Sequence, residues 1–229
     1  MNQKRISQLI LGGGLLFCFL AGPALAVQAK SPLFLNVPFT SQAPLGQWSD
    51  LRQEDGCEEA TAAMAMAWVK DQTGQTKTWW RNRVVGLSDF ELRNYGEYRD
   101  VSLSDMVKWL FVGYYAYNRV AIKPVNTAAD IISELEAGKI VLIPMDGRLL
   151  LNPYYTPPGP QTHMLLVKGY DYASGEFITN DSGTRRGESY RYPAKILLNA
   201  IRVYPTGSHE PVKKIIKEMI VISKTGSVK

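Results

Sequence analysis

Cysteine and histidine are the residues of this sequence best suited to nucleophilic chemistry, and only a few are present. Cys57 follows Gly56 and begins a helix-forming run. At a helix N-terminus, unpaired backbone N–H groups and the macrodipole favour a thiolate. His163 opens an apolar run directly after a loop, and an imidazole is the usual base for a thiol. His209 lies in a polar segment and is interpreted as a solvated loop residue. The sequence therefore predicts Cys57 as a nucleophile and His163 as its base.

An ordinary structural interpretation exists for each of these two residues. Free cysteine is among the most buried residue types, and a single histidine can be a satisfied structural residue. The argument for Cys57 comes from the expected compartment. The other cysteine, Cys18, lies in a predicted export leader, so the exported chain would hold one unpaired thiol. Because an unpaired thiol is prone to oxidation outside the cytosol, we expect it to have a chemical role.

The N-terminal segment has the three parts of an export signal. Lys4 and Arg5 precede an apolar run over residues 9–22, and Ala24-Leu25-Ala26 follows. This pattern predicts a signal peptide over residues 1–26 with cleavage after Ala26. The alternative is a retained anchor, but the run is shorter than the roughly 20 apolar residues that span a membrane. We expect a secreted, periplasmic or cell-envelope protein with no membrane span after cleavage.

Four carboxylates surround the predicted nucleophile in the sequence. Glu54 and Asp55 precede Cys57, and Glu58 and Glu59 follow it. Carboxylates near a thiolate raise its pKa by repulsion, although acidic residues also stabilise helix N-termini. Activation of the thiol is therefore expected to come mainly from the histidine.

A third group is needed to orient the imidazole. A hairpin centred near Tyr172 would place His163 opposite Asp181, and opposite residues have Cβ atoms about 4.5–5.5 Å apart. A turn centred on Ser174-Gly175 would shift this register. We therefore predict Asp181 as the orienting residue, with Asn180 as the alternative. The segment Asn-Asp-Ser-Gly could also be turn chemistry alone.

The composition predicts one ordinary globular domain from Val27 to Lys229. Loss of Lys4 and Arg5 with the leader lowers the net charge from +5 to +3, which is too small to indicate a nucleic-acid partner. The sequence contains no recognisable cluster of metal ligands and no cofactor motif, so no cofactor is expected. A peptide or protein substrate is the expected partner, and the oligomeric state is left open.

The pattern of apolar residues divides the chain into a helical first half and a β-rich second half. Helices are expected at 57–72, 102–110 and 127–137, the last two from capping signals at their starts. Strands are expected at 32–40, 139–145, 163–172, 176–181, 190–192 and 217–223, with a short helix at 193–201. The predicted fold is α+β, in which an N-terminal helical half bearing Cys57 packs on an antiparallel sheet bearing His163 and Asp181.

Four segments together resemble a known superfamily. VPFTSQAP, QEDGCEEATAAMAM, HMLLVKGYD and FITNDSG are similar to the papain-like cysteine peptidases, and more narrowly to free-standing relatives of the bacteriocin-processing peptidases that cleave double-glycine leaders. The resemblance runs from about Leu35 to Ile201. It implies a papain-like fold, a Cys57–His163–Asp181 triad and a glutamine before the cysteine as oxyanion donor. That glutamine usually stands six residues before the cysteine, where this chain has Leu51, so Gln53 is the nearest candidate.

We expect from these residues a cysteine peptidase that cleaves a peptide or amide bond. One alternative is a catalytically weak or inactive domain of the same fold that binds peptides. Another is an amidase or transglutaminase-like acyl transferase that acts on cell-wall peptides. The proline-rich loop 151–162 and the tryptophans Trp48, Trp79 and Trp80 are candidates to line a substrate groove, with packing and loop stiffening as the alternative for each.

Overall fold

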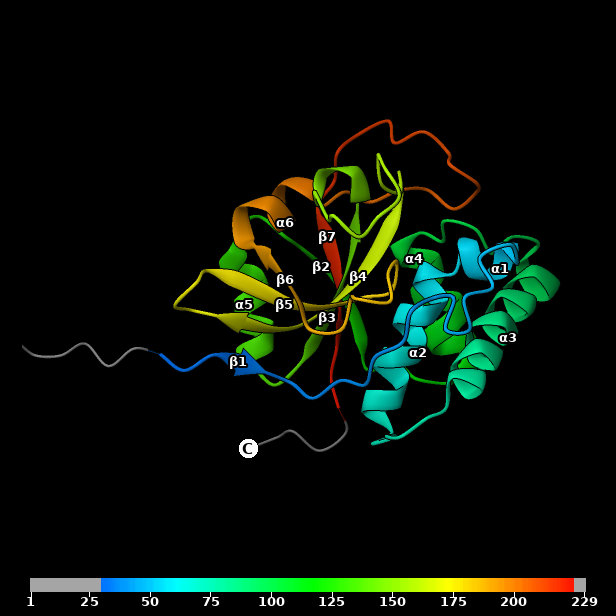
Figure 1. Cartoon of the computed structure of the whole chain (residues 1–229), viewed down its shortest axis with the longest axis horizontal. Coiled ribbons are helices and arrows are strands. Elements are labelled where there is room, and N and C mark those ends of the chain that lie inside the picture. Colours follow the sequence, from blue (N-terminus) through cyan, green and yellow to red (C-terminus); the bar gives the residue numbers. More distant parts are fainter. Residues whose placement is uncertain (1–29, 225–229) are drawn as a thin grey trace, which may run out of the picture.

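The computed structural model describes residues 30–224, so the predicted leader and its cleavage site lie outside the described residues. A group of helices lies beside an antiparallel sheet (Figure 1). The helices are α1 (Leu51–Glu54), α2 (Cys57–Val69), α3 (Lys77–Tyr95), α4 (Leu103–Asp105), the π-helix η1 (Met106–Tyr114), α5 (Ala128–Glu136), the 3-10 helix η2 (Gly147–Leu149) and α6 (Ala194–Ala200). Within residues 30–224, no helix combines the length and the apolar character needed to cross a bilayer.

Seven strands form one antiparallel sheet. They are β1 (Leu33–Phe34), β2 (Val120–Pro124), β3 (Ile140–Met145), β4 (His163–Asp171), β5 (Glu176–Asp181), β6 (Tyr190–Pro193) and β7 (Glu218–Ile222). Their order is β2-β7-β3-β4-β5-β6, and β1 pairs with β4. The predicted α+β division, with the cysteine on the helical side and the histidine in the sheet, is confirmed.

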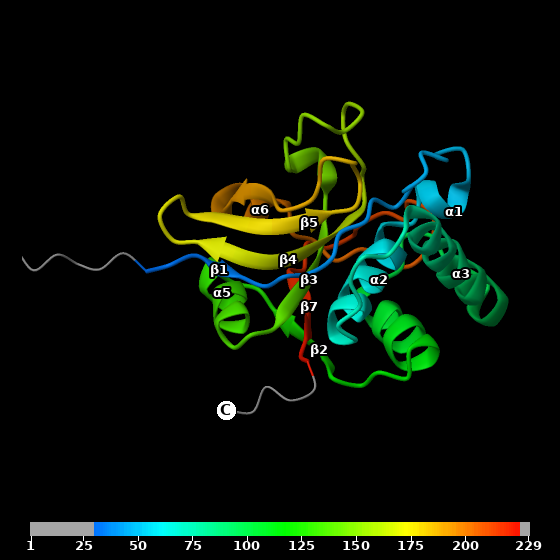
Figure 2. The same ribbon diagram turned by 60° about the horizontal axis from the view of Figure 1, so that its bottom comes forward.

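Strand β3 shows why the sheet lies at the centre of the molecule. All six of its residues are buried, because both faces of the sheet are covered. Leu142 packs in a cluster with residues of α2, α3 and η1, whereas its neighbours Val141 and Ile143 pack with residues of α5 and α6. Figure 2 shows α2 and α3 on one side of the central strands β3 and β7, and α5 and α6 on the other side.

Helix α2 is the central element of the helical half. Every residue from Cys57 to Trp68 is buried, and five of them are alanines that permit close approach of neighbouring backbones. The helix packs against α3 on one side and β4 on another. The hydroxyl of Thr61 donates to the Met164 carbonyl at 3.3 Å. These contacts fix the N-terminal end of α2, and hence Cys57, next to the start of β4.

Helix α3 was not predicted, although its sequence carries the usual end signals. The Thr76 side chain accepts a hydrogen bond from the Trp79 backbone N–H, and Gly96 ends the helix with φ of 83°, as expected for a glycine C-cap. Its buried positions recur with helical spacing at Trp80, Val84, Leu87, Ser88 and Glu91. The short elements α1 and β2 were also not predicted, and the helix expected at 102–110 continues as η1 to Tyr114.

The predicted strand at 32–40 is wrong except for its first part, because only Leu33–Phe34 pairs with β4. Beyond this point the backbone carbonyls are satisfied by a side chain. The Asn180 amide donates to the carbonyls of Val37 and Pro38 at 3.2 and 3.1 Å. A side-chain partner for these carbonyls replaces the ladder of a regular strand.

The predicted hairpin of β4 and β5 is present, but its register differs by two residues. Asp181 lies opposite Leu165, not opposite His163. The turn occupies residues 172–175 and is not centred on Tyr172, and the register also shifts between Val167 and Gly169. The alternative turn position at Ser174-Gly175 is therefore nearer to the observed one.

Gly169 is needed at the irregularity in β4. A Cβ atom there would meet the Leu33 carbonyl oxygen of β1 and lie 3.3 Å from the Ile178 Cβ. We expect Gly169→Ala to lower the free energy of unfolding by about 1–3 kcal/mol, which is typical of overpacking. Gly86→Ala in α3 is the matched control, because nothing lies within 4 Å of its Cβ position and alanine favours a helix by about 1 kcal/mol. Urea unfolding measures both, and equal effects of the two substitutions would contradict this account.

Candidate active site

Cys57 is the first residue of α2 and follows Gly56, as predicted. A Cβ at position 56 would lie 2.5 Å from the Arg52 carbonyl oxygen and 2.9 Å from Val84 Cγ1. Glycine is therefore required for the close passage of α1 into α2. Cys57 is 5% exposed, and its backbone N–H belongs to the unpaired first turn of the helix.

The thiol is held by a neighbouring carboxyl group. Cys57 Sγ donates to Glu58 Oε2 at 3.0 Å. Burial raises the pKa of the Cys57 thiol well above its ordinary value, and the charge and hydrogen bond of Glu58 raise it further. The pKa of Cys57 thus lies in the direction that the sequence predicted from the nearby carboxylates, with burial as the larger cause.

His163 is the first residue of β4 and is paired with Met145 of β3. Its Nε2 lies 2.8 Å from Asp181 Oδ1, and both side chains are buried. This bond leaves Nδ1 as the imidazole nitrogen that can exchange a proton with another group. The Tyr155 ring and the imidazole pack edge to face, with ring centroids 5.6 Å apart. The structure therefore brings His163 and Asp181 together.

Asp181 is surrounded by hydrogen-bond donors. Its Oδ2 accepts from the hydroxyls of Tyr155 and Tyr192, each at 2.6 Å, and from the Asn152 amide at 3.1 Å. Its Oδ1 also accepts from the Gly183 backbone N–H at 3.1 Å. Burial alone would raise the pKa of Asp181, but His163 and the two tyrosine hydroxyls lower it below its ordinary value. The carboxyl group is therefore ionised and can stabilise an imidazolium.

Asn180, the alternative orienting residue, has a different task. Besides its two bonds to the segment before α1, its Oδ1 accepts from the Ser189 backbone N–H at 3.2 Å. All of these partners are backbone groups that hold loops to the sheet. The structure places Asp181, and not Asn180, beside the imidazole.

The structure does not bring Gln53 to the candidate site. Its side chain is fully buried, and its amide nitrogen lies 3.3 Å from both the Gln47 carbonyl and Asp50 Oδ2. The short helix α1 turns Gln53 back toward its own preceding loop. Gln42 lies in the site instead, with its amide donating to the Glu54 carbonyl.

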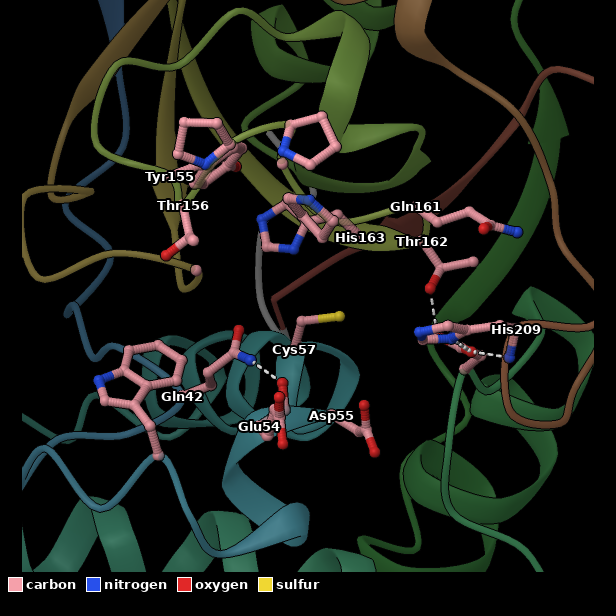
Figure 3. A pocket seen from close by; sticks show the side chains of 17 residues that line it. Gln42, Glu54, Asp55, Cys57, Tyr155, Thr156, Gln161, Thr162, His163 and His209 are labelled. Carbon is pink, nitrogen blue, oxygen red and sulfur yellow. Dashed lines mark hydrogen bonds and ion pairs between the residues drawn. The ribbon is translucent and has the colours of Figure 1, made fainter.

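A cavity of about 360 Å³ joins these groups. Cys57 and His163 both line it, Cys57 from the helical side and His163 from the sheet (Figure 3). Residues 155–162 of the proline-rich loop cover one side, and Trp48 and Gly183 line another, so the loop and Trp48 do line a groove. Trp79 and Trp80 do not line it, because α3 packs them with the hydrophobic core. A Cβ at position 183 would lie 2.9 Å from His163 Cε1, so Gly183 is needed for the imidazole to fit.

The remaining cavity residues are mostly acidic. Glu54, Asp55 and Asp100 line it, together with His209. The His209 side chain is 59% exposed, as predicted, but its Nδ1 also lies 2.9 Å from Asp100 Oδ2, and this hydrogen bond raises the pKa of His209. Among the described residues no group of three or more His, Cys, Asp or Glu side chains is arranged to hold a metal ion.

Several residues of the site were not predicted from the sequence. Gln42 stands in the segment VPFTSQAP that carries part of the resemblance, but its distance from Cys57 along the chain gave no local signal. Tyr155, Tyr192 and Asn152 belong to segments that were expected only to form a loop and a strand. Their roles follow from the packing around Asp181.

Comparisons with known proteins bear on the family and the fold of the chain. The model of the Peptidase_C39 like family matches residues 34–208. A crystal structure from Bacillus anthracis, of a protein named as a C39-like peptidase, superposes with a TM-score of 0.54 at 15% sequence identity. The match covers 85% of this chain and 99% of that chain. No curated protein sequence matches the chain. The expected papain-like α+β fold is confirmed.

Proposed function

The chain belongs to the Peptidase_C39 like family, and on that premise we propose that it is a cysteine peptidase that hydrolyses peptide bonds. Cys57 is the nucleophile, His163 the base and Asp181 the group that orients the imidazole. The substrate is a peptide or protein that enters the cavity beneath the proline-rich loop.

One observation carries this proposal. A buried imidazole, bonded through Nε2 to an ionised carboxylate at 2.8 Å, lies in the same cavity as a cysteine at the start of a helix. A cysteine and a histidine that line one cavity, with a carboxylate bonded to the histidine, are the parts of a thiol hydrolase. The lowered pKa of Asp181 supports its role as the partner of an imidazolium.

The reaction proceeds in two steps. His163 Nδ1 takes the proton from Cys57 Sγ, and the thiolate attacks the carbonyl carbon of the scissile bond. The imidazolium then returns the proton to the leaving amine, which gives a thioester on Cys57. Water, deprotonated by His163, attacks the thioester, releases the acid and restores the thiol.

The oxyanion of each intermediate needs donors near Cys57. The backbone N–H of Cys57 at the start of α2 is one donor. The Gln42 amide is the second, because one of its two N–H groups bonds to the Glu54 carbonyl and the other remains for the substrate. Its Oε1 has no hydrogen-bond partner among the described residues. We therefore assign to Gln42 the oxyanion role that the sequence had predicted for Gln53.

One observation favours the alternative of a weak enzyme or peptide-binding domain. The thiol donates to Glu58 and not to His163, and its pKa is raised. In the active enzyme the S–H must therefore turn from Glu58 toward His163 before it gives up its proton. A domain in which this exchange never occurs would bind peptides without cleaving them.

We propose that the protein acts outside the cytosol after export, on the basis of the leader pattern at residues 1–26. Mass analysis of the protein isolated from its native cells is expected to show Val27 as the first residue. A protein that retains residues 1–26 would contradict this proposal and would agree with the anchor alternative.

Substitution of the nucleophile tests the proposed activity directly. We expect the wild-type protein to cleave members of a fluorogenic peptide library and Cys57→Ala to lose the activity by about 10⁴-fold or more, as for other catalytic nucleophiles. Far-ultraviolet circular dichroism checks that the variant is folded. Equal cleavage by the two proteins, or peptide binding without cleavage by both, would overturn the proposal.

The two glutamines are distinguished by their kinetics. Gln42→Ala is expected to lower kcat by about 10²–10³-fold with little change in KM, as when one oxyanion donor is lost. Gln53→Ala is the matched control and is expected to retain kcat, because its side chain lies outside the cavity. A larger loss of kcat in Gln53→Ala than in Gln42→Ala would restore the original assignment.

A further inference from the structure

Glu58 has an unusual position for a residue that follows the nucleophile on a helix. Successive helix residues normally point in different directions, yet Glu58 Oε2 lies 3.0 Å from Cys57 Sγ. The other oxygen, Oε1, accepts from the Tyr204 hydroxyl at 2.5 Å. Glu58 is fully buried, and none of the described lysines or arginines forms an ion pair with it. The carboxyl group is therefore fixed between a tyrosine and the sulfur.

The contact with Sγ has two chemical forms. An ionised Glu58 accepts the S–H of the thiol, whereas a neutral Glu58 can donate an O–H to a thiolate. Because Oε1 already accepts from Tyr204, the proton of the neutral form belongs on Oε2, which faces Sγ. The same contact therefore opposes the thiolate in one form and stabilises it in the other.

The surroundings favour the neutral form. Burial raises the pKa of Glu58 to about 8, with smaller contributions from the charges of Glu59 and Asp100. The titratable groups around Glu58 are Cys57 and Glu59 on α2, Glu91 on α3, Asp100 before α4 and Tyr204 after α6. None of them supplies a positive charge that would stabilise a carboxylate.

We propose that neutral Glu58 donates a hydrogen bond to the Cys57 thiolate, and that ionisation of Glu58 switches the nucleophile off. The inference rests on the proposed role of Cys57. In the active form the thiol proton passes to His163 Nδ1, and the Glu58 proton stays on Oε2. The products are a thiolate and an imidazolium, with no change in the net charge of the site. When Glu58 loses its proton, its carboxylate repels the thiolate and takes the S–H as a donor instead.

Thiol alkylation across pH tests this switch without any substrate. In the wild-type protein the rate of reaction with iodoacetamide is expected to fall about tenfold or more as the pH rises from 7 to 9.5. Ionised Glu58 repels the thiolate, so the proton held by the imidazolium returns to Cys57 Sγ, and the raised pKa of the thiol keeps it there.

The variant Glu58→Gln carries an amide that donates at every pH. Its alkylation rate is expected to stay level or rise over the same range. A wild-type rate that shows no fall, or a Glu58→Gln profile that superposes on a falling wild-type profile, would overturn the proposal.

Two further variants distinguish the direct contact of Glu58 with Cys57 from the electrostatic effect of the other carboxyl groups. Glu59→Gln, on the next residue of α2 and bonded to Ser88, is expected to keep the fall and move it to lower pH. If Glu59→Gln abolishes the fall, the direct contact is not its cause. Tyr204→Phe removes the donor that stabilises the Glu58 carboxylate, so the fall is expected at higher pH. This variant decides the matter if Glu58→Gln does not fold, and an unmoved fall would count against the proposal.

The outcome is independent of the peptidase assay. A protein that cleaves peptides but shows no alkaline fall retains the proposed function and loses this inference. A protein that shows the fall but cleaves no peptide retains the switch on a thiol whose reaction is of another kind.

Discussion

The buried carboxylate of Asp181 is the constraint on which the arrangement of the site depends. An ionised carboxylate without contact with water is costly unless its lone pairs are satisfied by donors. Here the donors come from four separate segments, namely the start of β4, the loop after β5, strand β6 and the proline-rich loop: His163, Gly183, Tyr192, Tyr155 and Asn152. Movement of any one segment would leave part of a buried charge unpaired. The position of the imidazole is thus fixed by the electrostatic demand of its partner, and the proline-rich loop is held over the cavity by the same demand.

The alternation of side chains between the two faces of the sheet explains why a hairpin prediction with the wrong register still paired His163 with Asp181. Asp181 lies opposite Leu165, and His163 is two residues away on the same face of the sheet. Diagonal neighbours of this kind are about 7–8 Å apart at Cα, within reach of long side chains. An error of one residue would have placed the imidazole on the other face, where no contact is possible. The error of two residues preserved the face, so the contact survived.

The sequence was informative where one local pattern determined the structure. The alanine-rich run after Gly56 and the apolar run at 140–145 are buried on all sides, as their composition predicts. Helix α3 carries a Thr76 cap, Gly96 and a helical spacing of buried residues, so it could have been predicted from the same rules. Gln42 could not, because an irregular segment brings it to Cys57 and no periodicity describes such a path. The tyrosines around Asp181 are likewise selected by long-range packing, and nothing near them in the sequence marks them as its donors.

Buried carboxyl groups on the two sides of this site have pKa values shifted in opposite directions. Asp181 receives charged and neutral donors on both oxygens, and its pKa is lowered despite burial. Burial raises the pKa of Glu58, Glu59 and Glu91 on the helical side, and neighbouring carboxyl groups add to the shift. Environments that shift the pKa values of titratable groups in opposite directions in this way give the groups different roles. The negative charge of the site is thereby placed behind the imidazole, where it favours His163 as a cation. Beside Cys57 burial raises the pKa of Glu58 to about 8, which is the condition that the proposed thiolate needs at neutral pH. Of the four acidic residues that surround the cysteine in the sequence, Glu58 and Glu59 are buried without cations, and burial is what makes them compatible with a nucleophile.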